Sequence, residues 1–171
     1  MTDPDPVVDR LIEAGSTVAT AESITAGRLG ARLTDGAGAS SAYLGGVITY
    51  ATEVKISVLG VPEALIDDHG VISSECARSM AEKVRDMVGT TYGVSTTGVA
   101  GPDTQEDQPV GTVFIGVAGP DSTDVRQLAL DGDRMEIQKE TVAAAMSALT
   151  DMVDADERSS AGRGMEHQGL G

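Results

Sequence analysis

The residues Thr17 to Leu33, TVATAESITAGRLGARL, change abruptly from a strand pattern to a helix pattern. Val18 to Ala21 are small or β-branched and predict a short strand. The spacing of Leu29 and Leu33, four residues apart, predicts a helix that follows it. This stretch therefore indicates a strand that leads directly into a helix, which is typical of α/β folds.

Two hydroxyl residues, Ser23 and Thr25, lie where the predicted strand ends and the helix begins. Such a junction offers free backbone N–H groups at the positive end of a helix dipole, which suit an anion or an oxyanion. On spacing alone, the simpler interpretation is that one of these hydroxyls caps the helix. The rest of the chain must decide between the two interpretations.

The pattern along the chain predicts one α/β domain over residues 1–154, with three layers (α/β/α) and a mixed, partly parallel sheet. The strand Leu44 to Ala51 is a continuous apolar run, which is typical of a strand covered on both faces. Gly119-Pro120-Asp121 predicts a turn between two antiparallel strands. Residues 155–171 are polar and Gly-rich, and we expect a disordered tail there. The expected helices are 7–12, 26–33, 53–59, 62–69, 73–88 and one from residue 134, and the expected strands are 18–21, 44–51, 92–97, 111–118 and 124–130.

The charge balance is strongly acidic, with 27 acidic residues against 12 basic ones and a formal net charge of −15. A nucleic-acid or anionic-membrane binder needs the opposite balance, because neutralisation of phosphates dominates its affinity. Acidic residues spread along the chain, with only 3 lysines, indicate a halophilic source. Loss of the folded state at low salt would support that interpretation.

The single cysteine, Cys76, excludes an internal disulfide and fits a reducing compartment. It falls on the apolar side of a predicted helix, so we expect a buried structural thiol rather than a nucleophile. The start, MTDPDP, is acidic rather than signal-like, and no stretch approaches the apolar length of a membrane span. We expect a soluble, cytoplasmic protein.

Three segments that begin where predicted strands stop are expected to line one pocket: Glu22–Gly27, Thr49–Lys55 and Thr97–Pro102. Ligands of α/β sheets collect beyond the carboxyl ends of parallel strands. The third segment is Gly-rich and could present several N–H groups to a phosphate or a carboxylate. A tight loop with glycine for backbone reasons alone would look the same.

The reactive side chains do not form a Ser-His-Asp triad, because the only histidines are His69, in a short helix, and His167, in the tail. With one cysteine and two separated histidines, no transition-metal site is expected. A serine nucleophile would need another base, and Lys55 is the leading candidate, with Tyr50 able to relay or orient a proton. A lysine acts as a base only where burial or nearby cations lower its pKa. An exposed, salt-bridging lysine is the alternative.

The blocks AESITAGRLGARLTD, SSAYLGGVITYATEVKISVLGV and STTGVAGPD, with PVGTVFIGVA after them, closely resemble the CinA C-terminal domain family. The resemblance covers residues 7–153 and preserves the spacing between the blocks. It implies deamidation of nicotinamide mononucleotide (NMN) to nicotinic acid mononucleotide and ammonia, with no metal or organic cofactor. It also implies homodimers or larger assemblies, and this chain is similar to the stand-alone form of the domain.

The resemblance implies that Ser23 is the nucleophile, with Lys55 and Tyr50 beside it. Loop N–H groups would stabilise the oxyanion. A direct attack by water that Ser23 orients is the alternative route. The residues expected to bind the substrate lie in the same loops or at the start of the last helix: Glu22, Thr25, Gly27, Thr97, Gly98, Ala100, Gly101 and Arg134.

The side chain of Glu22 has two interpretations of equal weight. It could lie beside the positive pyridinium ring of the substrate, or it could bond loop amides as a structural carboxylate. The 5′-phosphate would bind N–H groups of the loop Gly98–Gly101 or of the helix start at Ser23–Thr25, with Arg134.

Three residues depart from the family pattern. Ile24 stands where cysteine is usual, Ala26 replaces the first glycine of a pair, and Gln138 replaces an arginine. Ala26 adds a methyl group in a loop where we expect tight backbone approach, so it is expected to narrow the pocket or restrict φ. The alternative function that Ala26 and Gln138 suggest is a non-catalytic nucleotide-binding or interaction module.

Overall fold

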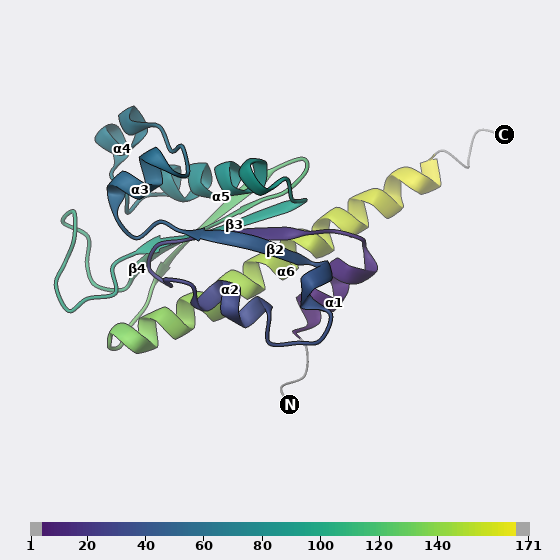
Figure 1. Cartoon of the computed structure of the whole chain (residues 1–171), viewed down its shortest axis with the longest axis horizontal. Coiled ribbons are helices and arrows are strands. Elements are labelled where there is room, and N and C mark those ends of the chain that lie inside the picture. The colour runs from purple at the N-terminus through teal and green to yellow at the C-terminus, as the bar shows by residue number, and fades with distance from the viewer. Residues whose placement is uncertain (1–4, 167–171) are drawn as a thin grey trace.

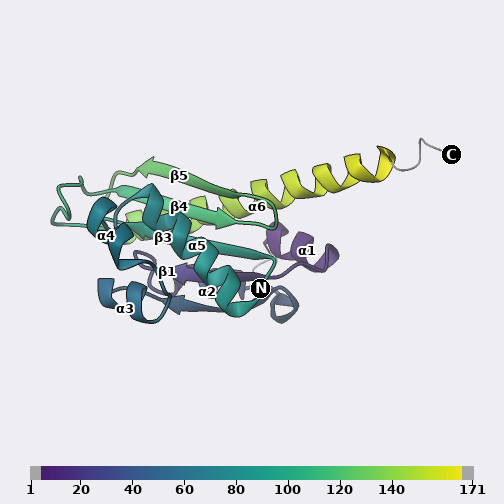
Figure 2. The same ribbon diagram turned by 90° about the horizontal axis from the view of Figure 1, so that it is seen from above.

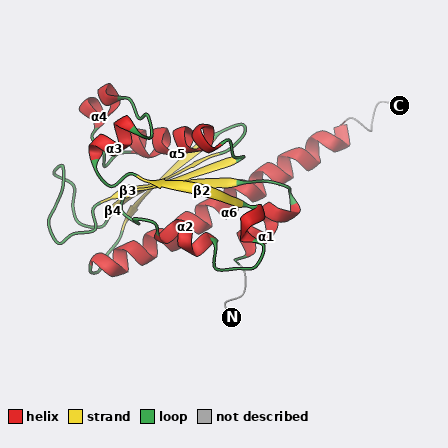
Figure 3. Cartoon of the chain, in the orientation of Figure 1, coloured by secondary structure: helices red, strands yellow, loops and turns green. Residues whose placement is uncertain are grey.

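The computed structural model describes residues 5–166 and gives the same order of helices and strands that the sequence predicts (Figure 3). The elements are α1 (Pro6–Glu13), β1 (Val18–Glu22), α2 (Arg28–Leu33), the 3₁₀ turn η1 (Ala39–Ser41), β2 (Tyr43–Ile48), α3 (Thr52–Ser57), α4 (Glu63–His69), α5 (Ser74–Val88), β3 (Tyr92–Gly98), β4 (Thr112–Ala118), β5 (Thr123–Ala129) and α6 (Arg134–Glu166).

The strands form one five-stranded sheet in the order β2-β1-β3-β4-β5 (Figure 2). β1 runs parallel to both of its neighbours, β2 and β3, whereas β4 runs antiparallel to both of its neighbours, β3 and β5. The prediction of a mixed, partly parallel sheet is confirmed, as is the hairpin of the last two strands. The carboxyl ends of β1, β2 and β3 consequently meet at one edge of the sheet.

Helices cover both faces of the sheet and give three layers (Figure 1). α3, α4 and α5 lie on one side, and α1, α2 and α6 lie on the other. Each side has its own apolar core: Leu11, Ile115 and Leu149 belong to the α6 side, and Met80 and Phe114 to the α5 side. The α/β/α layering is thus confirmed.

The expectation that the second strand is covered on both faces is wrong. β2 is an edge strand that pairs only with β1, and its residues alternate between half-buried and exposed. Leu44 and Ile48 are 51% and 54% exposed. An apolar run cannot distinguish a central strand from an edge strand, because the run does not say how many neighbours the strand has.

The prediction of disorder from residue 155 onward is also wrong over the described residues. α6 continues as a helix to Glu166, although residues 157–165 are exposed and bury no apolar side chain. Ala161 and Arg163 favour a helix, but Gly162 and Gly164 in the same stretch oppose it, so intrinsic propensity alone does not explain this extension. Residues 167–171, and His167 with them, lie outside the described residues.

The turn between β1 and α2 contains an unusual backbone conformation. Ala26 has φ +47° and Gly27 has φ +97°, so two successive residues lie at positive φ. For an alanine this region costs about 1 kcal/mol, because its Cβ crowds the following carbonyl oxygen. The departure from glycine at position 26 therefore strains the turn that carries Ser23.

We predict that Ala26→Gly raises the free energy of unfolding by about 1 kcal/mol, since glycine adopts positive φ without this crowding. Urea unfolding measures the change. Ala31→Gly, at an exposed position inside α2, is the matched control and should lower the free energy of unfolding by about 1 kcal/mol. Destabilisation by both substitutions would contradict the account of strain at Ala26.

Candidate active site

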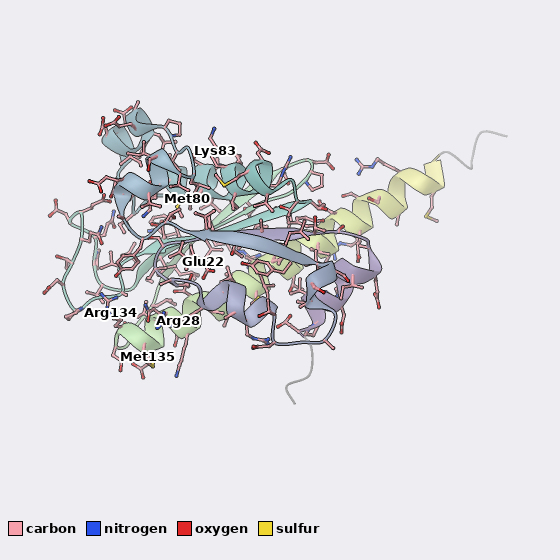
Figure 4. The ribbon with its side chains drawn as sticks, in the orientation of Figure 1. Glu22, Arg28, Met80, Lys83, Arg134 and Met135 are labelled. Atoms are coloured by element: carbon pink, nitrogen blue, oxygen red, sulfur yellow. The ribbon has the colours of Figure 1, made fainter. Side chains whose placement is uncertain are left out.

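A pocket of about 520 Å³ lies beyond the carboxyl ends of β1, β2 and β3. Figure 4 shows Arg134 at the start of α6, near the long loop that follows β3. The three predicted segments each contribute to the pocket, and the start of α6 and the link between α4 and α5 complete it. Its lining residues are Ser23, Ile24, Tyr50, Ala51, Thr52, Lys55, Val71, Ile72, Thr97, Gly98, Val99, Ala100, Gly101, Pro102, Asp103, Thr104, Gln105 and Arg134.

Ser23 and Lys55 are in direct contact in this pocket. Lys55 Nζ lies 3.0 Å from Ser23 Oγ. Ser23 follows the last residue of β1, and its N–H donates to the carbonyl of Thr96 on β3 at 3.0 Å. Its hydroxyl is therefore fixed at the end of two adjacent strands, within proton-transfer distance of an amine.

Lys55 is almost completely buried, with 1% of its surface exposed. Two backbone carbonyls also accept from its Nζ, that of Thr49 at 2.7 Å and that of Tyr50 at 3.4 Å. Burial lowers the pKa of Lys55 from its ordinary value of 10.5, because the charged ammonium has lost its water. A neutral Lys55 amine can donate its two N–H groups to these carbonyls, and its lone pair is then left for the hydroxyl of Ser23.

Glu22 is a structural carboxylate, and the interpretation that it contacts the substrate is not supported by its position. Its side chain is buried, with 2% exposed, and it does not line the pocket. Oε1 accepts from the amides of Gly27 at 3.1 Å and Leu29 at 2.8 Å, and Oε2 accepts from that of Gly30 at 3.0 Å. The first amides of α2 are thus occupied by a carboxylate of the same chain, so they do not form a free anion site.

The side chain of Thr25 and the amide of Gly27 likewise form hydrogen bonds within the turn. Neither residue lines the pocket. Thr25 Oγ1 donates to Glu22 Oε1 at 2.6 Å and lies 2.8 Å from Thr96 Oγ1. At Gly27, a Cβ would meet the side chain of Ile48 at 3.2 Å. The expectation that Thr25 and Gly27 bind the substrate is not supported by these positions, because their polar groups face the protein.

The loop after β3 does line the pocket, as predicted. Thr97 donates its hydroxyl to the carbonyl of Val71 at 2.7 Å, which ties the loop to the link before α5. The amides of Ala100 and Gly101 donate to no acceptor within the described part of the chain. They are consequently available to an anionic or carbonyl oxygen of a ligand.

Tyr50 does not stand between Ser23 and Lys55. Its side chain is 59% exposed, and its hydroxyl lies 3.5 Å from Nη1 of Arg134. Arg134 also donates Nε to the carbonyl of Gly101 at 3.0 Å. Tyr50 and Arg134 therefore form the rim of the pocket, and the direct contact of Lys55 with Ser23 leaves no place for a Tyr50 relay.

Two polar residues that the sequence analysis named have contacts that it did not predict. Gln138, 5% exposed, donates Nε2 to the carbonyl of Ile24 at 3.0 Å. Thr49 is fully buried, and its Oγ1 is the one buried side-chain oxygen or nitrogen, among those described, that has no hydrogen-bond partner. Gln138 is 114 residues away from Ile24 in the chain, so no local pattern could have revealed their contact.

The remaining titratable residues do not suggest another chemistry. Cys76 is fully buried, and burial raises the pKa of its thiol to about 11, as expected for a structural cysteine. His69 lies on the surface, 3.7 Å from Glu75. Among residues 5–166, no three His, Cys, Asp or Glu side chains gather into a group that could hold a metal ion. No helix in the same range combines the length and the apolar character that a membrane crossing requires.

Comparison with known proteins gives one consistent result. The family model described as CinA C-terminal domain matches residues 4–153. A CinA-like protein of Frankia casuarinae is 51% identical over 147 residues, and a competence-damage inducible protein of Bacillus pumilus is 46% identical over 143 residues. These matches cover 86% and 84% of this chain but 34% of each relative. The chain therefore spans about a third of the length of these curated relatives.

Solved structures of similar proteins match the whole fold. The crystal structure of a CinA superfamily protein from Klebsiella pneumoniae has a TM-score of 0.84 at 30% identity, and covers 87% of this chain and 94% of its own. A competence damage-inducible protein A, also from Klebsiella pneumoniae, has a TM-score of 0.82 at 28% identity, with coverages of 88% and 96%. The similarity thus extends over nearly all of each solved chain.

We predict that Lys55 makes the stability depend on pH. Between the lowered pKa of Lys55 and the ordinary value of 10.5, the unfolded chain binds more protons than the folded chain, so its contribution to the free energy of unfolding rises with pH. Lys55→Met removes this contribution. The free energy of unfolding of the variant minus that of the wild type should therefore fall as pH rises from the lowered pKa of Lys55 to 10.5. Urea unfolding at several pH values measures it.

Lys83→Met, at an exposed position on α5, is the matched control for the loss of one lysine. A difference between wild type and Lys55→Met that stays constant over the whole pH range would contradict a lowered pKa for Lys55.

Proposed function

The chain belongs to the CinA C-terminal domain family, and on this premise we propose that it is an amidohydrolase that converts NMN and water into nicotinic acid mononucleotide and ammonia. One observation carries the proposal: the buried amine of Lys55 lies 3.0 Å from the hydroxyl of Ser23 at the bottom of a pocket. A serine hydroxyl paired with a lysine of lowered pKa is a nucleophile and base suited to attack on an amide carbon.

In the first half of the proposed reaction, Ser23 Oγ bonds to the carboxamide carbon while its proton passes to Lys55 Nζ. The C–N bond then breaks, and the nitrogen takes that proton from Lys55 and leaves as ammonia. The carbonyls of Thr49 and Tyr50 support both states of the lysine, because they accept N–H bonds from the amine and from the ammonium. This gives Tyr50 a role through its backbone rather than through its phenol.

The oxyanion of the tetrahedral intermediate would bind backbone N–H groups. The amide of Ile24 directly follows Ser23, Ile24 lines the pocket, and this amide donates to no acceptor within the described residues. A donor next to the nucleophile in the chain is well placed for this purpose, because it moves with the nucleophile. The amides of Ala100 and Gly101 are further candidates.

The 5′-phosphate of the substrate would bind at the rim of the pocket, since Glu22 already fills the start of α2. Arg134 uses Nε and Nη1 toward Gly101 and Tyr50, and its remaining N–H groups can bind phosphate oxygens. The chain has a net charge of −15, and among its described residues Lys55 and Arg134 are the only lysine or arginine residues that line the pocket.

In the second half, water attacks the acyl carbon while Lys55 accepts one of its protons, and the bond to Ser23 Oγ breaks. The hydroxyl of Ser23 is then restored by the proton that Lys55 holds. No step of this cycle needs a metal or an organic cofactor. Direct attack by a water that Ser23 orients remains the competing route, and it predicts a different result for the loss of Ser23.

We predict that Ser23→Ala lowers the rate of ammonia release from NMN by about 10³-fold or more. Lys55→Met should lower it by about 10²- to 10⁴-fold, since the general base is lost. The measurement is ammonia release in molar KCl, with Ser41→Ala, at an exposed serine, as the matched control. Turnover that survives in Ser23→Ala would indicate direct water attack. A folded wild type that binds NMN without releasing ammonia would indicate a binding module.

We predict that Arg134→Gln raises KM for NMN about tenfold, which corresponds to roughly 1.4 kcal/mol of lost binding, and leaves kcat within about twofold. The reason is that Arg134 lies at the rim and makes no contact with Ser23 or Lys55. Lys139→Gln removes the same charge from α6 outside this pocket and should leave KM unchanged. Equal effects of the two substitutions would mean that only the overall charge matters.

A further inference from the structure

The long loop between β3 and β4 forms one wall of the pocket and extends beyond the end of the sheet (Figure 1). Its residues Asp103, Thr104 and Gln105 line the pocket, yet residues 103–107 are all exposed and bury no side chain. A segment without apolar burial depends on hydrogen bonds for its position. The hydrogen bonds of residues 103–108 therefore determine whether this wall is fixed.

One carboxylate connects this segment to the rest of the protein. Glu106 Oε1 accepts from the amide of Val71 at 2.9 Å, and Oε2 accepts from the amide of Ile72 at 2.9 Å. Among the described residues, these are the only hydrogen bonds between residues 103–108 and the remainder of the chain. Val71 and Ile72 themselves line the pocket, so the carboxylate joins two of its walls.

The loop is anchored at both ends, outside this segment. Arg134 Nε donates to the carbonyl of Gly101 at 3.0 Å, and the amide of Gly111 donates to the carbonyl of Val99 at 2.8 Å. Neither anchor involves Glu106. Release of its carboxylate consequently frees the segment between the anchors without breaking a hydrogen bond of β3 or β4.

The segment also carries backbone strain. Glu106 and Asp107 have φ +52° and +59°, and they lie at the centre of a tight turn in which the amide of Gln108 donates to the carbonyl of Gln105 at 2.9 Å. Positive φ is unfavourable for residues with a Cβ and persists only where the surrounding structure holds it. The two hydrogen bonds of Glu106 must offset this strain, so the segment is held with little free energy to spare.

The other side of the contact is shaped to receive a carboxylate. Gly70, with φ +78°, directly precedes the two amides, and a Cβ there would meet Glu106 Oε2 at 2.5 Å. Successive N–H groups in such a turn form a concavity that suits an anion. The carbonyl of Val71 is held by the hydroxyl of Thr97 at 2.7 Å. The two amides thus belong to the fixed side of the contact, and the loop segment is the side that moves.

We propose that residues 103–108 are a lid over the pocket and that Glu106 is its latch. The lid is closed while the carboxylate accepts from the amides of Val71 and Ile72. It opens when the carboxylate leaves them, and a ligand then enters or leaves the pocket. The lid does not depend on the identity of the ligand, whereas its effect on KM for NMN rests on the proposed function.

Hydrogen exchange of the wild type without ligand tests the lid directly. The amides of Val71 and Ile72 lose their acceptor whenever the latch opens. They should therefore exchange about tenfold or more faster than the amides inside β3, which exchange only through larger openings. Mass spectrometry of peptides that contain residues 71–72 or 93–97 gives the two rates.

Glu106→Gln keeps the size of the side chain but removes its charge and one of its two acceptor oxygens. We expect exchange of the Val71 and Ile72 amides to become about tenfold faster than in the wild type. Asp107→Asn is the matched control, since it removes the same charge from the next, exposed residue of the lid and leaves the contact of Glu106 in place. Its exchange should equal that of the wild type.

Gly70→Ala disturbs the same contact from the fixed side, because its Cβ displaces the carboxylate without changing the charge of the lid. It should also speed exchange of the two amides about tenfold. Gly60→Ala is its matched control. Gly60 has φ +81°, and a Cβ there meets nothing within 4 Å, so this variant carries the strain of an alanine at positive φ without affecting the latch.

The lid should also affect KM. If only the closed state holds the ligand fully, a smaller closed population weakens the apparent affinity in proportion. Glu106→Gln and Gly70→Ala should raise KM for NMN about tenfold and leave kcat within about twofold. The reason is that saturating substrate closes the lid again, and the hydrogen bonds of Glu106 do not involve Ser23 or Lys55. The two control variants should leave KM unchanged.

The possible outcomes separate the lid from the proposed function. Exchange of the Val71 and Ile72 amides as slow as inside β3 would overturn the lid, and so would exchange that neither Glu106→Gln nor Gly70→Ala changes. Faster exchange with an unchanged KM would reduce Glu106 to a structural contact and overturn the lid as well. A folded wild type that releases no ammonia from NMN would reject the proposed function, whereas the exchange rates, measured without ligand, would still decide on the lid.

Discussion

The pocket depends first on a buried carboxylate. Glu22 ends β1 with 2% of its surface exposed, and a carboxylate without water is tolerated only where donors surround it. The amides of Gly27, Leu29 and Gly30 and the hydroxyl of Thr25 supply those donors. To bring them together, the chain must turn back on itself directly after β1, and Ser23 is the first residue of that turn. The need to satisfy one charge therefore fixes the position of the candidate nucleophile.

A second buried ionisable side chain, Lys55, contacts the same turn. Lys55 belongs to α3, and its Nζ is bonded to two backbone carbonyls and to the hydroxyl of Ser23. Because the carboxylate of Glu22 is fully used by α2 and Thr25, it forms no ion pair with Lys55 in the described structure. Burial consequently acts on Lys55 without a neutralising carboxylate in contact, which is the condition under which its pKa falls.

Much of this arrangement follows from the sequence alone, because it depends on local pattern and on strand order. The order of elements, the parallel core of the sheet and the convergence of Ser23 with Lys55 were predicted from strands that stop before polar residues. The sequence could not show which way a polar group faces: Glu22 and Thr25 were expected near a ligand and face the protein instead. It also could not show that β2 is an edge strand or that α6 continues beyond its buried part, since neither follows from hydrophobic pattern. The sequence also left open whether Lys55 is buried or an exposed, salt-bridging lysine, and the structure buries it.

The departures from the family pattern concern how the turn is held and leave the reacting groups in place. Arg134 and Gln138 are four residues apart and therefore lie on the same face of α6. One holds the carbonyl of Gly101 at 3.0 Å, and the other holds the carbonyl of Ile24 at 3.0 Å. A single turn of helix thus connects the loop after β3 with the turn after β1. The neutral amide of Gln138 makes its contact without adding another charge to Glu22 and Lys55, which are already buried.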